Sequence, residues 1–287
     1  VDLTGASISS AAVTELVQSQ PNLTRLNLLG LQQLTDEAVL AMANCCPKLT
    51  DVCLRKCGLV TDDSLEELCQ SCPGLTALDL GFCSLVTDAT LMALAMHCKA
   101  INTLSIELCG LVTDQGVVAI AESCGVNLTS VNLKLCCLIQ SRAIEYLANH
   151  CHALRTVNLD SCRYVFDDCM MMIADPDLVD LDISACKQLT DIALEDIAEN
   201  CPDLKRLDLS DCTRVSPKIV RKITKNCPNL QELSLAHISK LPETVLDEIS
   251  ACRSLTSIDM SYCRHLNDDV LVALSNNCDV IKKISLC

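Results

Sequence analysis

The sequence repeats itself with a period of about 26 residues over almost its whole length. The pattern Leu-x-x-Leu-x-Leu-x-x-Cys returns at intervals of 24 to 27 residues. Its first apolar residue is, copy by copy, Leu23, Leu49, Leu75, Ile101, Leu128, Leu154, Leu178, Leu204, Leu230, Leu255 and Ile281. Periods of roughly 20 to 50 residues are typical of solenoids, whose units bury their apolar faces against one another. The period predicts a single stack of about 10 to 11 units over residues 1–287.

Each unit has the pattern of one strand followed by one helix. In residues 75–80, apolar and polar residues end in alternation, as in a half-buried strand. In residues 87–95, a Thr-Asp pair that is typical of helix starts precedes apolar residues spaced by three and four. A Cys-Pro pair such as Cys72-Pro73 then ends the helix. Because helices are wider than strands, we expect an α/β horseshoe with a concave parallel sheet and convex helices.

The 23 cysteines fit this stack better than they fit a disulfide framework, because their number is odd and most recur at two phases of the repeat. One ladder follows the strands: Cys57, Cys83, Cys109, Cys136, Cys162, Cys186, Cys212 and Cys263. A second ladder closes the helices: Cys46, Cys72, Cys98, Cys124, Cys151, Cys201, Cys227, Cys252 and Cys278. Both predict buried, reduced thiols and therefore a cytoplasmic or nuclear protein.

The full pattern continues after the strand cysteine as [Leu/Val]-Thr-Asp, then [Leu/Val]-x-x-Leu-Ala, then Cys-Pro. It resembles the cysteine-containing leucine-rich repeat of F-box proteins, and the resemblance covers nearly all of the chain. The resemblance implies a horseshoe that captures a substrate protein, while an F-box ahead of it binds the Skp-type adaptor of a cullin ubiquitin ligase. Residues 1–287 contain no F-box and no evident polar terminal cap, so we expect them to be part of a longer protein.

Three classes of function stay open. The first is substrate recognition for a Skp-cullin-F-box ubiquitin ligase. The second is a scaffold or assembly subunit without ubiquitin transfer, since the same repeat occurs in a yeast nucleotide-excision-repair subunit and in axonemal regulatory proteins. The third is a metal- or redox-dependent sensor, although Cys69-x-x-Cys72 has no second pair at zinc-finger spacing. We predict no metal, no cofactor and no enzymatic activity, because no nucleophile elbow, phosphate loop or zinc helix is present.

A partner protein is expected on the concave face and its loops, where side chains are not needed for packing. The candidate residues are Arg55, Asp79, Phe82, Glu107, Lys134, Asp160, Tyr164, Asp182, Asp208 and Tyr262. Arg55, Phe82, Tyr164 and Tyr262 are the expected anchors, because aromatic and Arg side chains supply large or forked contacts. The alternative is that each of them is a solvated loop residue.

The charge is unevenly distributed. The net charge of −15 disfavours direct binding of nucleic acid, and no apolar stretch is long enough to span a membrane. Seven basic residues nevertheless fall within one repeat: Lys205, Arg206, Arg214, Lys218, Arg221, Lys222 and Lys225. They predict a basic patch for an acidic partner or, alternatively, an ordinary solvated surface.

Two repeats depart from the pattern. Repeat six, residues 154–176, lacks the helix-closing cysteine and is two residues short, so we expect a shortened helix. Repeat nine has Ile238 where the strand cysteine is usual and Pro242-Glu243 where Thr-Asp is usual. There are two alternative interpretations: these departures bend the solenoid, or they are sequence drift.

Overall fold

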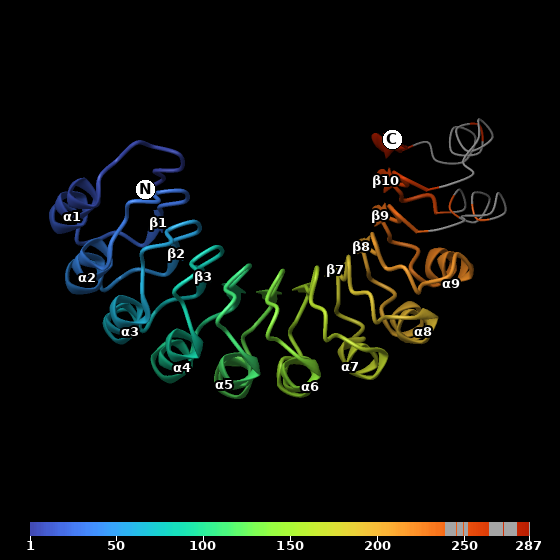
Figure 1. Cartoon of the computed structure of the whole chain (residues 1–287), viewed down its shortest axis with the longest axis horizontal. Coiled ribbons are helices and arrows are strands. Elements are labelled where there is room, and N and C mark those ends of the chain that lie inside the picture. Colours follow the sequence, from blue (N-terminus) through green and yellow to red (C-terminus); the bar gives the residue numbers. More distant parts are fainter. Residues whose placement is uncertain (239–244, 246–248, 250–251, 264–271, 273–279, 287) are drawn as a thin grey trace. The chain divides into compact units, whose positions relative to one another are not determined.

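The structure is a computed structural model, and it describes residues 1–238, 245, 249, 252–263, 272 and 280–286. It falls into two compact units, Val1–Leu154 and Arg155–Cys287, which we call unit 1 and unit 2. Within each unit, strands lie side by side on one face and helices form a row on the other (Figure 1). Among the described residues, no helix combines the length and the apolar character needed to cross a bilayer.

The elements alternate along the chain as predicted. The helices of unit 1 are α1 (Ser10–Ser19), α2 (Asp36–Cys45), α3 (Asp62–Ser71), α4 (Asp88–His97), α5 (Asp114–Cys124) and α6 (Ser141–His150). Its strands are β1 (Arg25–Asn27), β2 (Asp51–Cys53), β3 (Ala77–Asp79), β4 (Thr103–Ser105) and β5 (Ser130–Asn132). The described helices of unit 2 are α7 (Asp167–Ile173), α8 (Asp191–Asn200) and α9 (Lys218–Asn226). Its strands are β6 (Thr156–Asn158), β7 (Asp180–Asp182), β8 (Arg206–Asp208), β9 (Glu232–Ser234), β10 (Ser257–Asp259) and β11 (Lys283–Ser285).

Within each unit, every strand pairs in parallel with the next one along the chain, with residues of equal repeat position side by side. The central residue of a strand points into the core, as Leu78 does in β3, and the leucine two positions later joins it. Leu78 is 1% exposed and Leu80 is fully buried. Burial of one such side chain stabilises the fold by roughly 1.5–3 kcal/mol. The predicted strand–helix solenoid is therefore confirmed in both units.

The chain leaves each strand through a tight turn. After β3, the Cys83 N–H donates to the Leu80 carbonyl at 3.0 Å, and Phe82 between them has a φ of 64°. A positive φ at this position is the mark of a type II turn and normally favours glycine. The same position has a positive φ in successive repeats, at Gly5, Gly30, Lys56, Phe82, Leu108, Leu135, Ser161, Ala185, Asp211, His237 and Tyr262. Among these described residues, only Gly5 and Gly30 have the residue type that would reveal this turn in the sequence.

The turn places the strand-side cysteine against the preceding repeat. The Cys83 Sγ donates to the Leu54 carbonyl at 3.2 Å, and Cys109 donates to Leu80 at the same distance. Equivalent bonds to the repeat before are made by Cys57, Cys136, Cys186, Cys212 and Cys263. Burial raises the pKa of Cys57 and of Cys109 to about 12, so both thiols stay protonated donors at neutral pH.

The helix-closing cysteines also join repeats. Cys72 caps α3, and its Sγ donates to the Cys46 carbonyl of the repeat before at 3.4 Å. Cys98 continues the ladder to Cys72 at 3.5 Å, and Cys227 bonds to Cys201 at 3.4 Å. The described cysteines are free thiols. Cys278 lies outside the described residues.

The Thr-Asp pairs start the helices as predicted, but their main bonds run between repeats. Asp62 at the start of α3 accepts from the Thr87 N–H at 3.0 Å, from the Thr87 hydroxyl at 2.7 Å and from the Thr90 hydroxyl at 2.5 Å. The Asp of one repeat therefore binds the Thr of the next, an arrangement we call the Asp–Thr ladder. It recurs from Asp36 to Thr61, from Asp88 to Thr113 and from Asp167 to Thr190. Ser216 takes the place of Thr opposite Asp191.

The structure describes all of repeat six but only part of repeat nine. Helix α7 of repeat six has 7 residues, whereas α8 has 10, so the predicted shortening is confirmed. In repeat nine, Ile238 is 1% exposed and its N–H closes the turn to Leu235 at 3.1 Å, as the cysteines do elsewhere. An aliphatic side chain thus fills the cysteine position. Pro242 and Glu243 lie outside the described residues.

Candidate functional site

The strand face of each unit consists of three columns of outward side chains. The first column comprises the first residues of the strands, and the middle column comprises their third residues. The middle column is Asn27, Cys53, Asp79, Ser105 and Asn132 in unit 1, and Asn158, Asp182, Asp208, Ser234, Asp259 and Ser285 in unit 2. The third column lies two positions further along the chain: Leu29, Arg55, Gly81, Glu107 and Lys134, then Asp160, Ser184, Ser210, Ala236 and Ser261. Apart from Leu29, the three columns consist of polar, charged or small residues, most of which lie outside the buried core.

Most of the Asn and Asp residues in the middle column have a structural role that the sequence analysis missed. The Asp79 carboxylate accepts the Gly81 N–H at 2.8 Å, and the Asn132 amide oxygen accepts the Lys134 N–H at 3.0 Å. Asp208 does the same for Ser210 at 2.8 Å. Such bonds to the backbone two residues on are Asx turns, which stabilise the exit from the strand. An oxygen acceptor is sufficient here, so the negative charge of Asp is not required by the turn.

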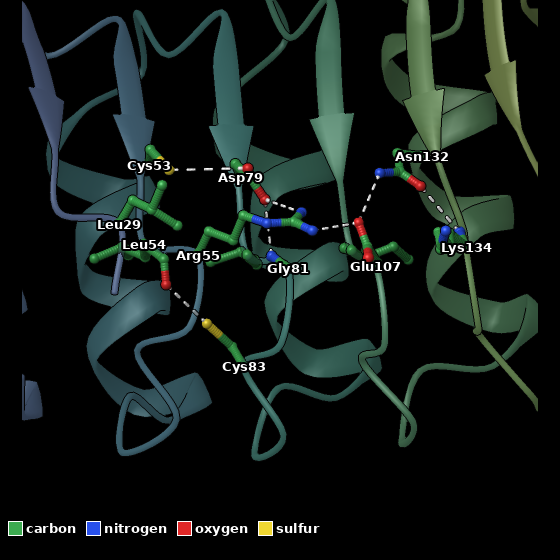
Figure 2. Close-up of polar contacts among 12 residues, drawn as sticks. Leu29, Cys53, Leu54, Arg55, Asp79, Gly81, Cys83, Glu107, Asn132 and Lys134 are labelled. Atoms are coloured by element: carbon green, nitrogen blue, oxygen red, sulfur yellow. Dashed lines mark hydrogen bonds and ion pairs between the residues drawn. The ribbon is translucent and has the colours of Figure 1, made fainter. Parts of the chain in front are cut away.

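In unit 1, the predicted residues Arg55, Asp79 and Glu107 form one network (Figure 2). The guanidinium of Arg55 crosses β3 to reach the Glu107 carboxylate at 2.5 Å and lies 3.8 Å from the Asp79 carboxylate. The Glu107 side chain is only 10% exposed and also accepts from Asn132 at 3.4 Å. A Cβ at Gly81 would come within 2.5 Å of the Arg55 guanidinium, so glycine leaves the space for this crossing.

Arg55 is held by a second contact. Its guanidinium lies 4.9 Å from the centre of the Phe82 ring, within the range of a cation–π interaction. Partial burial acts to lower the pKa of Arg55, but the bonds to Glu107 and the charge of Asp79 outweigh it and raise that pKa. The two expected anchors Arg55 and Phe82 therefore contact each other, and Arg55 is committed to an internal ion pair. Lys134 and Asp160 occupy third-column positions in unit 1 and unit 2 and are half-buried.

In unit 2, the strand face is acidic and hollowed. A hollow of about 270 Å³ is lined by residues of β7 to β11: Asp180, Leu181, Asp182, Arg206, Leu207, Asp208, Glu232, Leu233, Ser234, Ser257, Asp259 and Lys283. Burial, together with the charges of Asp208 and Asp160, raises the pKa of Asp182 above its ordinary value, although hydrogen bonds from Ser184 oppose this. Within the described residues, no three His, Cys, Asp or Glu side chains are arranged to hold a metal ion.

The two predicted tyrosine anchors lie in loops of unit 2. Tyr164 follows β6 and is 42% exposed, and Tyr262 follows β10 and is 68% exposed. The Tyr262 ring stacks on His237, with the ring centres 4.4 Å apart and the planes 13° from parallel. This pair is a stacked aromatic surface in the loops that follow β9 and β10.

The seven predicted basic residues are distributed over different parts of unit 2. Lys218, Arg221, Lys222 and Lys225 belong to α9, whereas Arg206 lies on the strand face and is paired with Asp180. Lys222 binds Glu195 at 3.2 Å and Glu199 at 2.7 Å, both on α8. Lys205 precedes β8, and Arg214 lies in the loop before α9, where it donates to the Gln188 side chain. The α9 residues form one group, to which Arg206 does not belong.

Sequence reasoning also missed an apolar row at the loop edge of unit 1. Leu59, Leu85, Leu111 and Leu138 follow the strand-side cysteine by two positions in consecutive repeats and are 45–51% exposed. Unit 2 has Tyr164, Gln188 and Arg214 at this position. In the sequence, this row appears as a leucine two positions after the strand-side cysteine and directly before a buried aliphatic residue. Core packing does not explain a leucine at this position.

Comparison with known proteins supports the fold. The leucine-rich-repeat family model matches residues 200–223 and 251–275. Comparison with curated protein sequences gave no match. Among solved structures, similarity extends to yeast Rad7 in its complex with Elc1, with 17% identity, a TM-score of 0.69 and coverage of 97% of this chain and 83% of that one.

Two bacterial proteins show the same likeness at 17% identity. An internalin of Listeria monocytogenes has a TM-score of 0.57, with 96% of this chain and 89% of the internalin covered. LegL7 of Legionella pneumophila, described as leucine-rich-repeat-containing, has a TM-score of 0.56, with 98% of each chain covered. At this level of identity the likeness shows the fold alone.

Proposed function

We propose that this leucine-rich-repeat protein is a non-catalytic binding module whose strand face holds another protein, most specifically as the substrate-recognition part of a Skp-cullin-F-box ubiquitin ligase. The observation that carries the proposal is the strand face itself. Its three columns present charged and polar side chains over consecutive repeats, and most of these side chains lie outside the buried core. Extended faces of this kind are the usual binding surfaces of solenoids.

Two further observations support the proposed role in a ubiquitin ligase. The cysteine-containing repeat resembles that of F-box proteins, and cysteines of both ladders donate hydrogen bonds to the preceding repeat. Rad7, whose structure is similar, was crystallised as a complex with a second protein, Elc1. The alternative is a scaffold subunit of a larger assembly, and the same strand face serves that role equally well. Cytoplasmic or nuclear residence is part of both proposals.

The test is affinity purification of the full-length gene product from its own cells, with mass spectrometry of the recovered proteins. Recovery of a Skp-type adaptor and a cullin supports the ligase function. A stable set of other subunits without an adaptor supports the scaffold instead.

A pair of matched variants tests the face. Thr103→Arg with Glu232→Arg adds bulk and positive charge to exposed strand positions in both units. Gln70→Arg with Glu122→Arg makes the same change in charge on exposed helix positions. We expect the first pair to lose the partner proteins and the second to retain them. Retention by both pairs would contradict binding through the strand face.

A further inference from the structure

The exposed side of β7 to β10 in unit 2 is a sheet face that no other part of the described chain covers. Its third column is made of small residues, Ser184, Ser210, Ala236 and Ser261, where unit 1 has Arg55, Glu107 and Lys134. The small side chains leave the middle column accessible from the solvent side. The resulting hollow of about 270 Å³ is open to solvent and is lined by strand residues of β7 to β11.

The charge of this face is concentrated in the middle column. Asp182 and Asp208 are direct neighbours across β7 and β8, and Asp259 lies beyond Ser234. The hydrogen bonds described for Asp182 come from Asn158 and Ser184, that for Asp208 comes from Ser210, and that for Asp259 comes from Ser261. In the first column Arg206 already pairs with Asp180. The middle column therefore carries negative charge that the ion pairs of the described residues leave uncompensated.

This charge is not needed for folding. Asn makes the same Asx turn at the ends of β1, β5 and β6. Like charges directly opposite on neighbouring strands destabilise a sheet, and the raised pKa of Asp182 has this repulsion as one of its causes. Unit 1 differs, since its middle-column Asp79 has Arg55 nearby. Charge that costs stability and is dispensable for the turn is typical of a binding surface.

An exposed aromatic pair borders the same face. His237 follows β9 and Tyr262 follows β10, each three residues after the middle-column residue of its strand. Tyr262 is 68% exposed, and its ring is fixed by the stack on His237. Exposed, rigid Tyr side chains are common anchors in protein interfaces and attract cations to their ring faces.

We propose that the strand face of β7 to β10, with Asp182, Asp208 and Asp259 at its centre and Tyr262 at its edge, binds a Lys/Arg-rich segment of a partner protein. The inference rests on the proposed function and specifies the chemistry of the partner. Basic side chains complement the three carboxylates, and binding relieves the repulsion between them. Apolar or acidic occupants do not have this complementarity.

The decisive variant is Asp182→Asn with Asp208→Asn and Asp259→Asn, because Asn keeps the Asx turns and removes the charge. The matched control is Asp63→Asn with Glu66→Gln and Glu122→Gln, which removes three charges from exposed helix positions. The probe is a fluorescein-labelled peptide with three Gly-Lys-Arg repeats, titrated by anisotropy at 0.1 M salt. A peptide with three Gly-Glu-Asp repeats is the negative probe.

We expect the strand-face variant to bind the basic peptide at least about tenfold more weakly, and the control to change by less than about twofold. We also expect the unliganded strand-face variant to melt at a higher temperature than the parent protein, which separates loss of binding from loss of fold. Tyr262→Ala should weaken binding severalfold. Equal weakening in the strand-face variant and the control, or no measurable binding of the basic peptide, would overturn the inference.

The same strand-face variant, expressed in cells, distinguishes this inference from the proposed function. If the parent protein recovers partners and the variant recovers them undiminished, the basic-segment inference fails and the binding module stands. If the parent protein recovers no partner, the proposed function itself fails.

Discussion

Single residues in this chain hold conformations that their type does not favour. Among the residues that the structure describes, nine non-glycine ones, including Phe82, Ala185 and Tyr262, have a positive φ at the same turn position of successive repeats. The left-handed region costs non-glycine residues roughly 1–2 kcal/mol each. These turns nevertheless persist, because the residue after each one donates its N–H back to the strand, as Cys83 does to the Leu80 carbonyl. Turn N–H groups also pair with the next repeat, as Phe82 does with the Glu107 carbonyl at 2.7 Å.

Ala185→Gly should therefore stabilise the protein by about 0.5–1 kcal/mol, since glycine adopts a φ of 53° without strain. Ala41→Gly, in the middle of α2, should destabilise it by about 0.5–1 kcal/mol. Urea denaturation of the two variants checks the opposite signs. A loss of stability in Ala185→Gly would mean that the turn is not strained.

A second prediction at the scale of single residues concerns the ion pair between Arg55 and Glu107. Arg55→Met leaves the Glu107 carboxylate, 10% exposed, without its cation and should cost about 1–3 kcal/mol, less than for a fully buried pair because Arg55 is 23% exposed. Adding Glu107→Leu should recover most of that loss. A double-mutant cycle by thermal or urea denaturation measures the coupling. If the stability changes of Arg55→Met and Glu107→Leu simply add in the double variant, the ion pair contributes nothing to stability.

At the scale of the element, the Asp–Thr ladder joins the starts of neighbouring helices, as from α2 to α3, from α3 to α4 and from α4 to α5. Burial disfavours the charged form of Asp62, but its bonds from Thr87 and Thr90 outweigh burial and lower its pKa below the ordinary 3.8. A carboxyl group whose pKa is lowered on folding contributes stability above its unfolded pKa, and this contribution disappears as the pH falls through the folded pKa. The ladder is thus a source of acid sensitivity.

Asp62→Ala should cost about 2–3 kcal/mol at pH 7, because three donors lose a charged acceptor. Asp63→Ala, the next residue on the exposed face of α3, should change stability by about 0.5 kcal/mol or less. Denaturation at pH 7 and at pH values below 3.8 checks both values, and the cost of Asp62→Ala should shrink in acid. A cost that is independent of pH would point to packing rather than to the ionised carboxylate.

The elements could be predicted from the sequence because the apolar period recurs along the chain and Thr-Asp helix starts recur in most of unit 1. Leu78 and Leu80 are buried as their spacing predicts, and α7 is short as its missing residues predict. The inter-repeat bonds could not be predicted, since Thr-Asp has the same local signature whether Asp62 caps its own helix or binds Thr87. The Arg55–Glu107 pair was missed for a related reason. It joins residues two repeats apart, and it depends on the space left at Gly81.

At the scale of the molecule, the contacts between elements within each unit connect neighbouring repeats. Stability in such a chain is close to a sum of repeat and interface contributions, so a local defect stays local. The reaction rates of the buried thiols measure whether a defect stays local, because a buried thiol reacts only when the repeat around it opens.

Thiol alkylation with mass spectrometry should label the half-exposed Cys45, Cys53, Cys137 and Cys263 first in the native protein. In Asp62→Ala, labelling should accelerate at Cys72, Cys83 and Cys98, next to the broken bond, and much less at Cys201, Cys212 and Cys227. Uniform acceleration at every buried thiol would show instead that the whole chain opens as one cooperative body.

The Asp–Thr ladder also bears on how such a chain lengthens over generations. A repeat whose helix starts with Thr-Asp carries both the acceptor for its successor and the donor for its predecessor, so a copied segment of one period brings both halves of the hydrogen-bonded pair. Tandem duplication or deletion of such repeats then leaves these junctions chemically complete. The number of repeats, and with it the reach of the binding surface, is free to vary without redesign of the fold.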